Sequence, residues 1–332
     1  MTILAADVGG TKSNLGLFEE GAGGALKLLF ERSYPTHDFP DSLATMLLRF
    51  LEEAQAPVHD VAAACVGIAG PVEDGICVAE WLPWHRVDEM EVSSGVGVRG
   101  TRMINDMVAT AWGVTALRPD QLVTLQEGER KPGRNVAVIA AGTGLGESAL
   151  IFDDGKYHAV TSEGGHTDWA PRNKAELDLF RFLLERSHRV TNEHVICGRG
   201  LVNVYTYFQS LRSGNPPAAL PDSDKDAGRI AKEAAAEPSS PAAQTMDLFV
   251  SAYGGRAGNL AMQVMATGGV YVGGGIAPKI LRRLEGGAFA RAFARKSKLR
   301  EWLERIPIHV VLDDRAALHG AARAAEAARH AR

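Results

Sequence analysis

Cysteine is scarce in this chain of 332 residues, which has only Cys65, Cys77 and Cys197. An odd number of cysteines without a regular spacing excludes both a disulfide-stapled secreted domain and a cysteine-rich zinc site. Long apolar runs are missing as well. The longest, residues 61–72, contains two glycines, and a membrane-spanning helix needs about 20 apolar residues.

Charge of one sign is not concentrated anywhere in the chain, whose net charge is −4. No basic stripe of the kind that nucleic-acid binding requires is present. The first 20 residues lack a signal-peptide pattern, because Asp7 and Lys12 interrupt any apolar core. We therefore predict a soluble cytoplasmic protein with small-molecule substrates, without a nucleic-acid partner and without membrane attachment.

What the sequence does contain is a repeated pattern of strands. Residues 2–6, 15–19 and 26–34 read as three consecutive strands with short, glycine-containing turns, and residues 136–141, 148–152 and 157–161 repeat that arrangement. With 45% hydrophobic residues, the chain has enough apolar surface for roughly two domains. We predict two similar α/β halves, each with one glycine turn, and the two turns facing each other across a cleft.

Helices and strands alternate after each of these triplets. Apolar residues at helical or strand spacing predict helices over 41–54, 107–117, 174–186, 200–211, 226–236, 242–265 and 315–329. Further strands are predicted over 61–69, 102–105, 270–272 and 308–312. Residues 213–224 contain three prolines and are predicted to form a loop.

Both glycine turns have the composition of a backbone nest for anions. The turn residues are Gly9, Gly10 and Thr11 in the first half and Gly142, Thr143 and Gly144 in the second. Successive N–H groups in such turns bind phosphate, and glycine leaves room for its close approach. Asp7 adds a carboxylate that suits Mg²⁺ between protein and phosphate. For either turn alone, an ordinary hairpin is the alternative.

Asn105 and Asp106 end one predicted strand and begin a predicted helix. Strand ends in α/β sheets point toward the ligand, and an aspartate there can accept the proton of a substrate hydroxyl. The alternative is that either residue serves only as the cap of the helix.

A second polar cluster begins with Glu163 and His166, which flank two glycines. A carboxylate and an imidazole supply the acceptors and donors that neighbouring sugar hydroxyls need, although a surface turn has the same composition. Glu193, further along, is by itself an ordinary carboxylate in the first turn of a helix.

Taken in order, these stretches resemble the bacterial ATP-dependent glucokinases of the actin/hexokinase/Hsp70 superfamily. The matching sequences are Asp-Val-Gly-Gly-Thr at 7–11, Ile-Asn-Asp at 104–106, Gly-Thr-Gly-Leu-Gly at 142–146, Glu-Gly-Gly-His at 163–166 and Gly-Gly-Gly-Ile at 273–276. Residues 197–205 resemble the segment that follows the second sugar-binding glutamate of the family. The ordered set covers nearly the whole chain, whereas the glycine turns alone would fit any member of the superfamily.

The resemblance implies two ribonuclease-H-like, actin-like ATPase domains around a central nucleotide and sugar cleft. The small α/β domain would comprise residues 1–115 with 315–332, and the large one residues 116–314. Both glycine turns would hold the phosphates of ATP, and Asp7 would hold Mg²⁺ through water. The adenosine would lie beside Gly273, Gly274 and Gly275.

For the sugar, the resemblance implies that glucose is bound by Asn105, Asp106, Glu163, His166 and Glu193. Asp106 would be the general base on the 6-hydroxyl. A homodimer is typical of the family and is the commonest assembly in general.

Two departures from related sequences stand out. Kinases of the repressor/open-reading-frame/kinase family carry a cysteine-rich zinc loop after the Glu-Gly-Gly-His stretch, but residues 167–185 contain no cysteine, so we expect no structural zinc. Many glucokinases have Thr-Asn before a Leu-Pro-Trp segment, where this chain has Glu80 and Trp81. Trp81 thus places an indole where related sequences have an amide, near the predicted sugar. This replacement can change which hexose the protein prefers.

Other functions fit parts of the pattern. A mannose or N-acetylhexosamine kinase would keep the fold and change the acceptor. A sugar-responsive regulator would carry a helix-turn-helix before the first glycine turn, and that turn begins at residue 7. A chaperone-like ATPase would lack the Asn-Asp and Glu…His pairs.

Overall fold

The structure, a computed structural model, describes residues 1–21, 24–129, 131 and 133–330. The predicted domain ranges also include residues 22–23, 130, 132 and 331–332, which lie outside the described residues. The chain divides into two compact units, which we call the first unit (Met1–Arg118 with Asp313–Arg332) and the second unit (Pro119–Leu312).

The first unit is built on a five-stranded sheet of order β3-β2-β1-β4-β8. Its strands are β1 (Thr2–Val8), β2 (Lys12–Glu20), β3 (Leu26–Pro35), β4 (Val61–Ile68) and β8 (Arg102–Asn105). The strands β1, β2 and β3 form an antiparallel meander, and β4 and β8 continue the sheet in parallel with β1. All five strands were predicted from the sequence. A small separate sheet of β5 (Val72–Glu73), β6 (Ile76–Val78) and β7 (Arg86–Asp88) was not.

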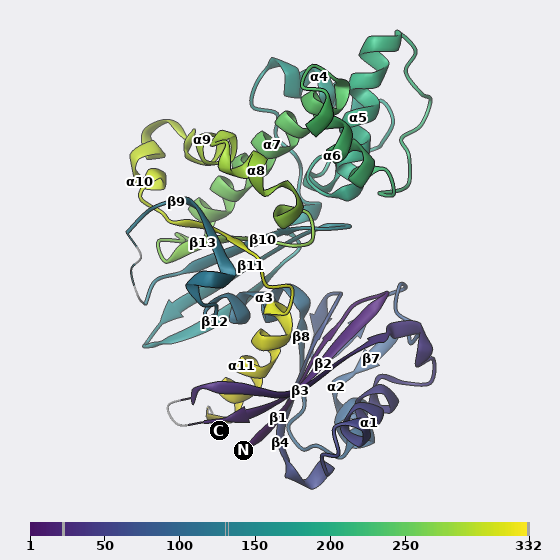
Figure 1. The fold of residues 1–332 in the computed structure, drawn as a ribbon, viewed down its shortest axis with the longest axis vertical. Helices are drawn as coiled ribbons and strands as arrows, with labels where there is room; N and C mark the ends of the chain where they lie inside the picture. Colours follow the sequence, from purple (N-terminus) through teal and green to yellow (C-terminus); the bar gives the residue numbers. More distant parts are fainter. Residues whose placement is uncertain (22–23, 130, 132, 331–332) are drawn as a thin grey trace. The chain divides into compact units, whose positions relative to one another are not determined.

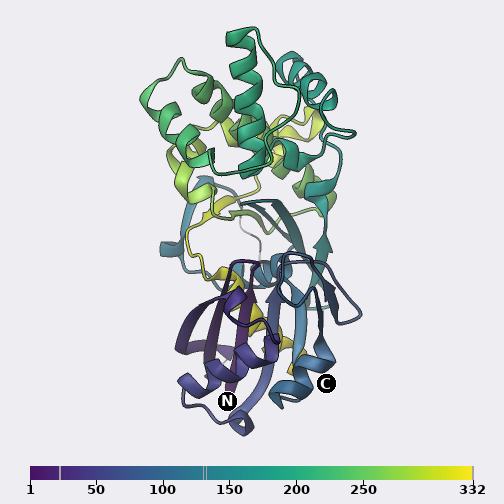
Figure 2. The same cartoon turned by 90° about the vertical axis from the view of Figure 1, so that its right-hand side faces the viewer.

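Both faces of this sheet are covered by helices. Successive side chains of β1 alternate between two cores, as strand geometry requires. Leu4 and Ala6 pack in a core with α1 (Leu43–Glu53) and α2 (Glu89–Val96), whereas Ile3 and Ala5 pack in a core with α3 (Asp106–Val114) and α11 (Ala316–His330). Figure 1 shows α1 and α11 on opposite sides of the strands, and in Figure 2 α1 lies in front of them and α11 behind.

Two glycines allow α3 and α11 to pack almost backbone to backbone. A Cβ atom at Gly320 would overlap the carbonyl oxygen of Ala109, and one at Gly113 would overlap that of Ala316. The C-terminal helix is therefore fixed directly to the helix whose first residue is Asp106.

The second unit contains a six-stranded sheet of order β12-β11-β10-β13-β14-β9. Its strands are β9 (Leu122–Gln126), β10 (Val136–Ala141), β11 (Leu145–Asp153), β12 (Lys156–Ser162), β13 (Gly269–Gly273) and β14 (Ile308–Val311). Its helices are α4 (Lys174–Leu184), α5 (Gly198–Ser213), α6 (Ala227–Ala236), α7 (Pro241–Gln263), α8 (Leu281–Glu285), α9 (Ala288–Ala294) and α10 (Arg300–Glu304). Strand β9 and the helices α2, α9 and α10 were not predicted.

The two sheets share one topology. In each, an antiparallel three-strand meander is followed by two strands that continue in parallel with the first strand. The predicted repetition of an α/β half is confirmed, with β9 as an addition at the edge of the second sheet.

Candidate active site

The first glycine turn joins β1 to β2 and is supported from two sides. The N–H of Gly9 donates to the carbonyl of Lys12 at 3.0 Å, and the hydroxyl of Thr36 donates to the carbonyl of Gly9 at 2.6 Å. A Cβ atom at Gly10 would lie 3.2 Å from Cδ1 of Trp81. The turn is therefore held tightly from the protein side.

Asp7 lies two residues before this turn. Its carboxylate accepts a hydrogen bond from the amide of Asn14 at 3.3 Å. Burial raises the pKa of Asp7, against the lowering effects of Asn14 and of the charge on Lys12. The ionised carboxylate is thus only partly compensated by the protein, and a bound cation would complete the compensation.

Asn105 and Asp106 lie at the start of α3. The side-chain oxygen of Asn105 accepts from the N–H of Met107 at 2.9 Å, and its amide donates to the carbonyl of Gly70 at 2.9 Å. A carboxylate oxygen of Asp106 also accepts from Met107, at 2.8 Å. Asn105 is therefore the cap of the helix, and the positive end of α3 favours a negative charge on Asp106.

Two successive rows of paired residues bring these residues of the first unit to the same end of the sheet. Asp7 of β1 is paired with Gly67 of β4, and Ile68 is paired with Asn105 of β8. The Cα atom of Asp106 lies 3.9 Å from the Cβ position of Gly67. Asp7 and Asp106 thus flank the same glycine.

The second glycine turn joins β10 to β11 and has two unlike glycines. A Cβ atom at Gly142 would have no heavy atom within 4 Å, so space is open beside it. At Gly144 the Cβ position is 2.5 Å from a carboxylate oxygen of Glu193. The expectation that glycine leaves room for phosphate fits Gly142. At Gly144 the space beside the glycine is taken by Glu193, and its role toward phosphate stays a prediction.

Glu193 links this turn to the predicted sugar-binding pair. One of its carboxylate oxygens accepts from the N–H of Leu145 at 2.6 Å, and the other lies 3.6 Å from Nδ1 of His166. The other ring nitrogen of His166 is 3.9 Å from Glu163. The side chains of His166 and Glu163 are 64% and 63% exposed, against 13% for Glu193. The structure therefore brings these three residues together, with one carboxylate fixed and two polar groups open to solvent.

A buried ion pair lies beneath this cluster and was not predicted from the sequence. Glu147 of β11 and Arg256 of α7 form two hydrogen bonds of 2.5 Å, and both side chains are almost completely buried. A Cβ atom at Gly164 would overlap the carboxylate of Glu147. The turn that carries Glu163 and His166 therefore rests directly on the ion pair. The available signal was a charged residue next to apolar neighbours in each of the two elements.

Tyr253 of α7 holds together the ends of β10 and β13. Its buried hydroxyl lies 3.1 Å from the N–H of Ala141, 3.2 Å from the carbonyl of Ile139 and 3.3 Å from that of Gly273. Gly274 has φ +81°, and a Cβ atom there would overlap Ala141. The segment of Gly273, Gly274 and Gly275 is thereby fixed beside the strand that leads into the second glycine turn.

Asp224 is a carboxylate near the second turn that sequence reasoning placed only in a loop. Its Oδ2 is 3.4 Å from the hydroxyl of Thr143, and its Cβ lies 2.9 Å from the Cβ position of Gly198. The N–H of Gly198, at the start of α5, donates to the carbonyl of Gly142 at 2.8 Å. The predicted loop over 213–224 thus ends against the turn.

Trp81 lies beside the first glycine turn. Its indole N–H donates to the carbonyl of Ala69 at 2.9 Å, and its side chain contacts Gly10 and Gly70. The residue is 54% exposed. Trp81 is therefore not a buried core aromatic. It lies close to the predicted site residues, because it contacts Gly70, whose carbonyl accepts a hydrogen bond from Asn105.

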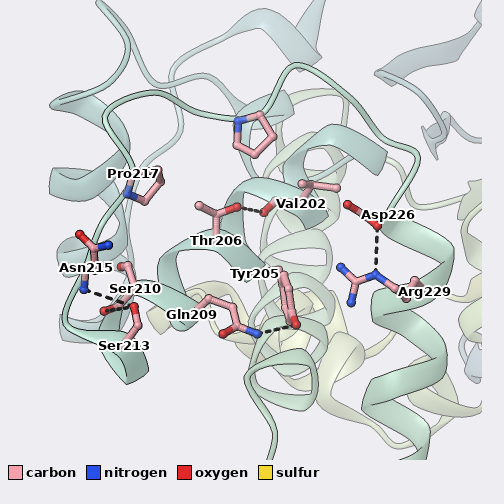
Figure 3. A pocket seen from close by; sticks show the side chains of 11 residues that line it. Val202, Tyr205, Thr206, Gln209, Ser210, Ser213, Asn215, Pro217, Asp226 and Arg229 are labelled. Carbon is pink, nitrogen blue, oxygen red and sulfur yellow. Dashed lines mark hydrogen bonds and ion pairs between the residues drawn. The ribbon is translucent and has the colours of Figure 1, made fainter.

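One cavity, of about 250 Å³, lies between α5, the following loop and α6 of the second unit (Figure 3) and includes none of the predicted site residues. Its polar side chains bind one another: Gln209 donates to Tyr205 at 2.5 Å, and Arg229 to Asp226 at 3.0 Å.

Within the described ranges, no group of three or more His, Cys, Asp or Glu side chains is placed to hold a metal ion. None of the described helices has the length and apolarity to span a bilayer.

The repeated sheets with glycine turns at corresponding strand ends define the actin-like ATPase fold that sugar kinases share. The model of the glucokinase family matches residues 4–328. The chain belongs to the glucokinase family.

Similar proteins support this assignment along the whole chain. The chain is 37% identical over 336 residues to a glucokinase of Nostoc sp. (strain PCC 7120 / SAG 25.82 / UTEX 2576), covering 96% of this chain and 97% of that protein. It is 31% identical over 319 residues to a glucokinase of Cronobacter sakazakii (strain ATCC BAA-894), covering 96% and 95%. Its fold matches a glucokinase from an Antarctic psychrotroph with a TM-score of 0.85 at 26% identity, covering 98% and 99%. It also matches a Balamuthia mandrillaris glucokinase in complex with glucose, with a TM-score of 0.77 at 23% identity, covering 98% and 93%.

Proposed function

We propose that this chain transfers the γ-phosphoryl group of ATP to the 6-hydroxyl of glucose, giving glucose 6-phosphate and ADP. The observation that carries the proposal is the double contact of Glu193, which binds the second glycine turn through Leu145 and also lies beside His166. One fixed carboxylate thus joins a phosphate-type turn to a group suited to sugar hydroxyls. Membership of the glucokinase family supports the same activity.

In the proposed reaction Asp106 is the general base. Its carboxylate is oriented by the N–H of Met107 at the N-terminus of α3, which supports a fixed acceptor in this role. Phosphoryl transfer passes through a loose transition state, so positioning and charge neutralisation matter more than a strong base. An ionised aspartate close to the 6-hydroxyl is sufficient, because the proton leaves late.

Glucose is held by five side chains in this proposal. Asn105, whose own amide is oriented by Gly70, acts together with Asp106 from the first unit. Glu163, His166 and Glu193 act from the second. Neighbouring hydroxyls of a pyranose need paired donors and acceptors, which carboxylates, an imidazole and an amide supply.

ATP is bound in this proposal by both glycine turns, Gly9, Gly10 and Thr11 with Gly142, Thr143 and Gly144, and its adenosine lies beside Gly273, Gly274 and Gly275. Asp7 fits a cation, because its partly buried carboxylate is only partly compensated by Asn14 and Lys12. Mg²⁺ held there through water neutralises phosphate charge when bound. The open space beside Gly142 is where the second turn admits a phosphate group.

The remaining assignments rest on the family alone. We propose residues 1–115 with 315–332 as the small domain, residues 116–314 as the large domain, a homodimeric assembly and a cytoplasmic location. Analytical ultracentrifugation of the purified chain tests the assembly.

A panel of hexoses with ATP and Mg²⁺, read by release of ADP, tests the activity. We expect glucose to give the highest kcat/KM. A higher value for mannose or an N-acetylhexosamine would move the assignment to a related hexose kinase. The comparison between hexoses is informative because Trp81, which replaces an amide of related sequences, contacts the first glycine turn. Absence of turnover with every sugar would overturn the proposal.

A further inference from the structure

A second cavity, of about 550 Å³, lies in the second unit among the start of α4, the middle of α7 and one face of α9. Figure 1 shows these helices in the helical part of that unit. Four cationic side chains line the cavity together with Asn173 and Ser251, and two alanines complete its wall; the cations are Arg172, Arg291, Arg295 and Lys296. The volume is in the range of pockets that bind small molecules.

The cavity is unusually positive. In the described part of the chain, none of its lining residues carries a carboxylate. Arg291 belongs to α9, and Arg295 is the residue that directly follows its end; both line the cavity, so two like charges face the same space. Among the described residues, Arg295 forms no ion pair, and Arg291 makes only a 3.4 Å hydrogen bond to the carbonyl of Gly286. Two guanidinium groups are therefore available to an anion.

Arg172 is held in place on the opposite side. Its Nε and Nη2 atoms donate to the buried carboxylate of Glu176 at 3.1 and 2.5 Å, and Nη2 also donates to Ser251 at 3.1 Å. Its Nη1 atom occupies the space that a side chain at residue 255 would need, which Gly255 leaves open. The guanidinium is thus fixed before any ligand arrives, which lowers the entropic cost of binding.

Lys296 is fixed in a similar way. Its ammonium group donates to the carbonyl of Gly255 at 2.9 Å and to the side-chain oxygen of Asn259. Burial, and after it the charges of Arg172 and Arg256, lower the pKa of Lys296 to about 8, against the opposing charge of Glu176. Two neighbouring positive charges thus add to the effect of burial at this point of the cavity.

We propose that this cavity binds the phosphoryl group of a small phosphorylated molecule. Guanidinium groups match the planar array of phosphate oxygens and give charge-assisted hydrogen bonds, and Asn173 and Ser251 add neutral polar groups. The enclosed volume holds a sugar phosphate as well as free phosphate. A polymer of phosphates fits less well, because the chain as a whole is negative at −4.

This site is separate from the proposed catalytic groups. None of the residues that line it belongs to either glycine turn or to the predicted sugar set. It does not depend on the proposed reaction, and its test must keep the two apart.

The test is isothermal titration of the full-length protein with inorganic phosphate and with glucose 6-phosphate. Saturating glucose and a non-hydrolysable ATP analogue are present, so that the catalytic groups are occupied. The test variant is Arg291→Gln/Arg295→Gln. We expect one anion per chain in the wild type and at least tenfold weaker binding in the variant, with turnover of glucose at low anion concentration unchanged. Equal affinity for both anions identifies free phosphate as sufficient, and tighter binding of glucose 6-phosphate shows that the sugar is recognised too.

The matched control is Arg181→Gln/Arg300→Gln, which removes the same charge from two exposed arginines that pair with Asp178 and Glu304. The control should bind the anions as the wild type does. No binding by the wild type at 10 mM anion (roughly the weakest affinity of interest), or equal weakening in test and control, overturns the proposal. So does a test variant that loses only its dimeric state, because the arginines would then serve a second copy of the chain. Thermal melting of both variants verifies that they are folded.

Discussion

The two glycine turns have the same place in two sheets of one topology, yet different chemistry surrounds them. Between β1 and β2, the second pair of residues before the turn is Asp7 with Asn14. Between β10 and β11, the corresponding pair is Ala140 with Gly146. The first turn is backed by the indole of Trp81, and the second by the carboxylate of Glu193. The same backbone turn is thus preceded by a carboxylate–amide pair in one sheet and by a small apolar pair in the other.

This difference suggests that the two turns have different roles in binding the substrates. The first turn combines backbone N–H groups with a carboxylate, the combination that suits phosphate with a metal ion. The second has Ala140 at the position that corresponds to Asp7, and it connects through Glu193 to the predicted sugar ligands. The following predictions test that difference in roles, beginning with the largest expected effect.

Asp106→Asn should lower turnover by about 10² to 10⁴, the usual range for a positioned general base. Binding of glucose should change little, because the amide still makes hydrogen bonds. The steady-state rate and the glucose affinity are both measured. Asp60→Asn, at an exposed site in the same unit, is the control. Turnover within a few fold of wild type would show that Asp106 is only part of the helix start.

Asp7→Asn should separate stability from activity. Since burial raises the pKa of Asp7, the folded protein binds its proton more tightly than the unfolded chain does. The free energy of unfolding therefore falls as pH rises from the unfolded pKa through the folded one, and at pH 7 the ionised form carries that cost. The variant should be as stable as wild type or more so without ligands, and turnover should fall by roughly 10² as charge neutralisation at the phosphate is lost.

Thermal melting at pH 7 and kinetics at several Mg²⁺ concentrations measure these two effects. Asn14→Ala, which keeps the carboxylate and removes its partner, is the comparison variant. If Asp7→Asn destabilises the protein and leaves the Mg²⁺ dependence unchanged, the carboxylate is structural.

Gly142→Ala and Gly144→Ala should affect different substrates. At 142 the new methyl group enters open space, so the KM for ATP should rise, by about tenfold if one phosphate contact is lost. At 144 the methyl group meets the carboxylate of Glu193, so the KM for glucose should rise more than that for ATP. The KM values for both substrates are measured for both variants. The same pattern in the two variants would contradict the difference in roles described here.

Trp81→Asn should produce the smallest effect. If the indole borders the sugar, the ratio of kcat/KM between glucose and its analogues mannose and glucosamine should change several fold, because hydrogen bonds to one hydroxyl are worth roughly 1 to 3 kcal/mol in a dry site. If Trp81 only supports Gly10, the melting temperature should fall and the sugar ratios should stay constant. Trp84→Phe, which removes a hydrogen bond to the carbonyl of Phe39, is the control for loss of an indole.

Sequence reasoning predicted those parts of the fold in which local pattern and tertiary structure agree. The strands around both turns alternate or cluster apolar residues, and α1 has its apolar residues at helical spacing, so both were found. The hairpin of β5 and β6 was missed because strands of two and three residues carry too little periodicity. The helix α10 is five residues long and was missed for the same reason.

In the site, too, local sequence pattern identified some residues and missed others. Motif order located the residues of the two turns and of the predicted sugar set. The partners that hold them were not found, because Glu147 and Arg256 are 109 positions apart and no local pattern connects them. The position of Glu193 beside Gly144 was not foreseen for this reason too, since Glu193 comes from a distant segment.

The tight contact of α11 with α3 has a consequence for the order in which the molecule forms. The second unit is one continuous stretch, so it is complete once residue 312 has left the ribosome. The first unit needs α11, which supplies Leu318 and several alanines to one of its cores. During synthesis, one face of the first unit's sheet therefore stays uncovered until α11 has been made. Since domains generally fold as units, the second unit should acquire its structure before the first, although it is encoded after it.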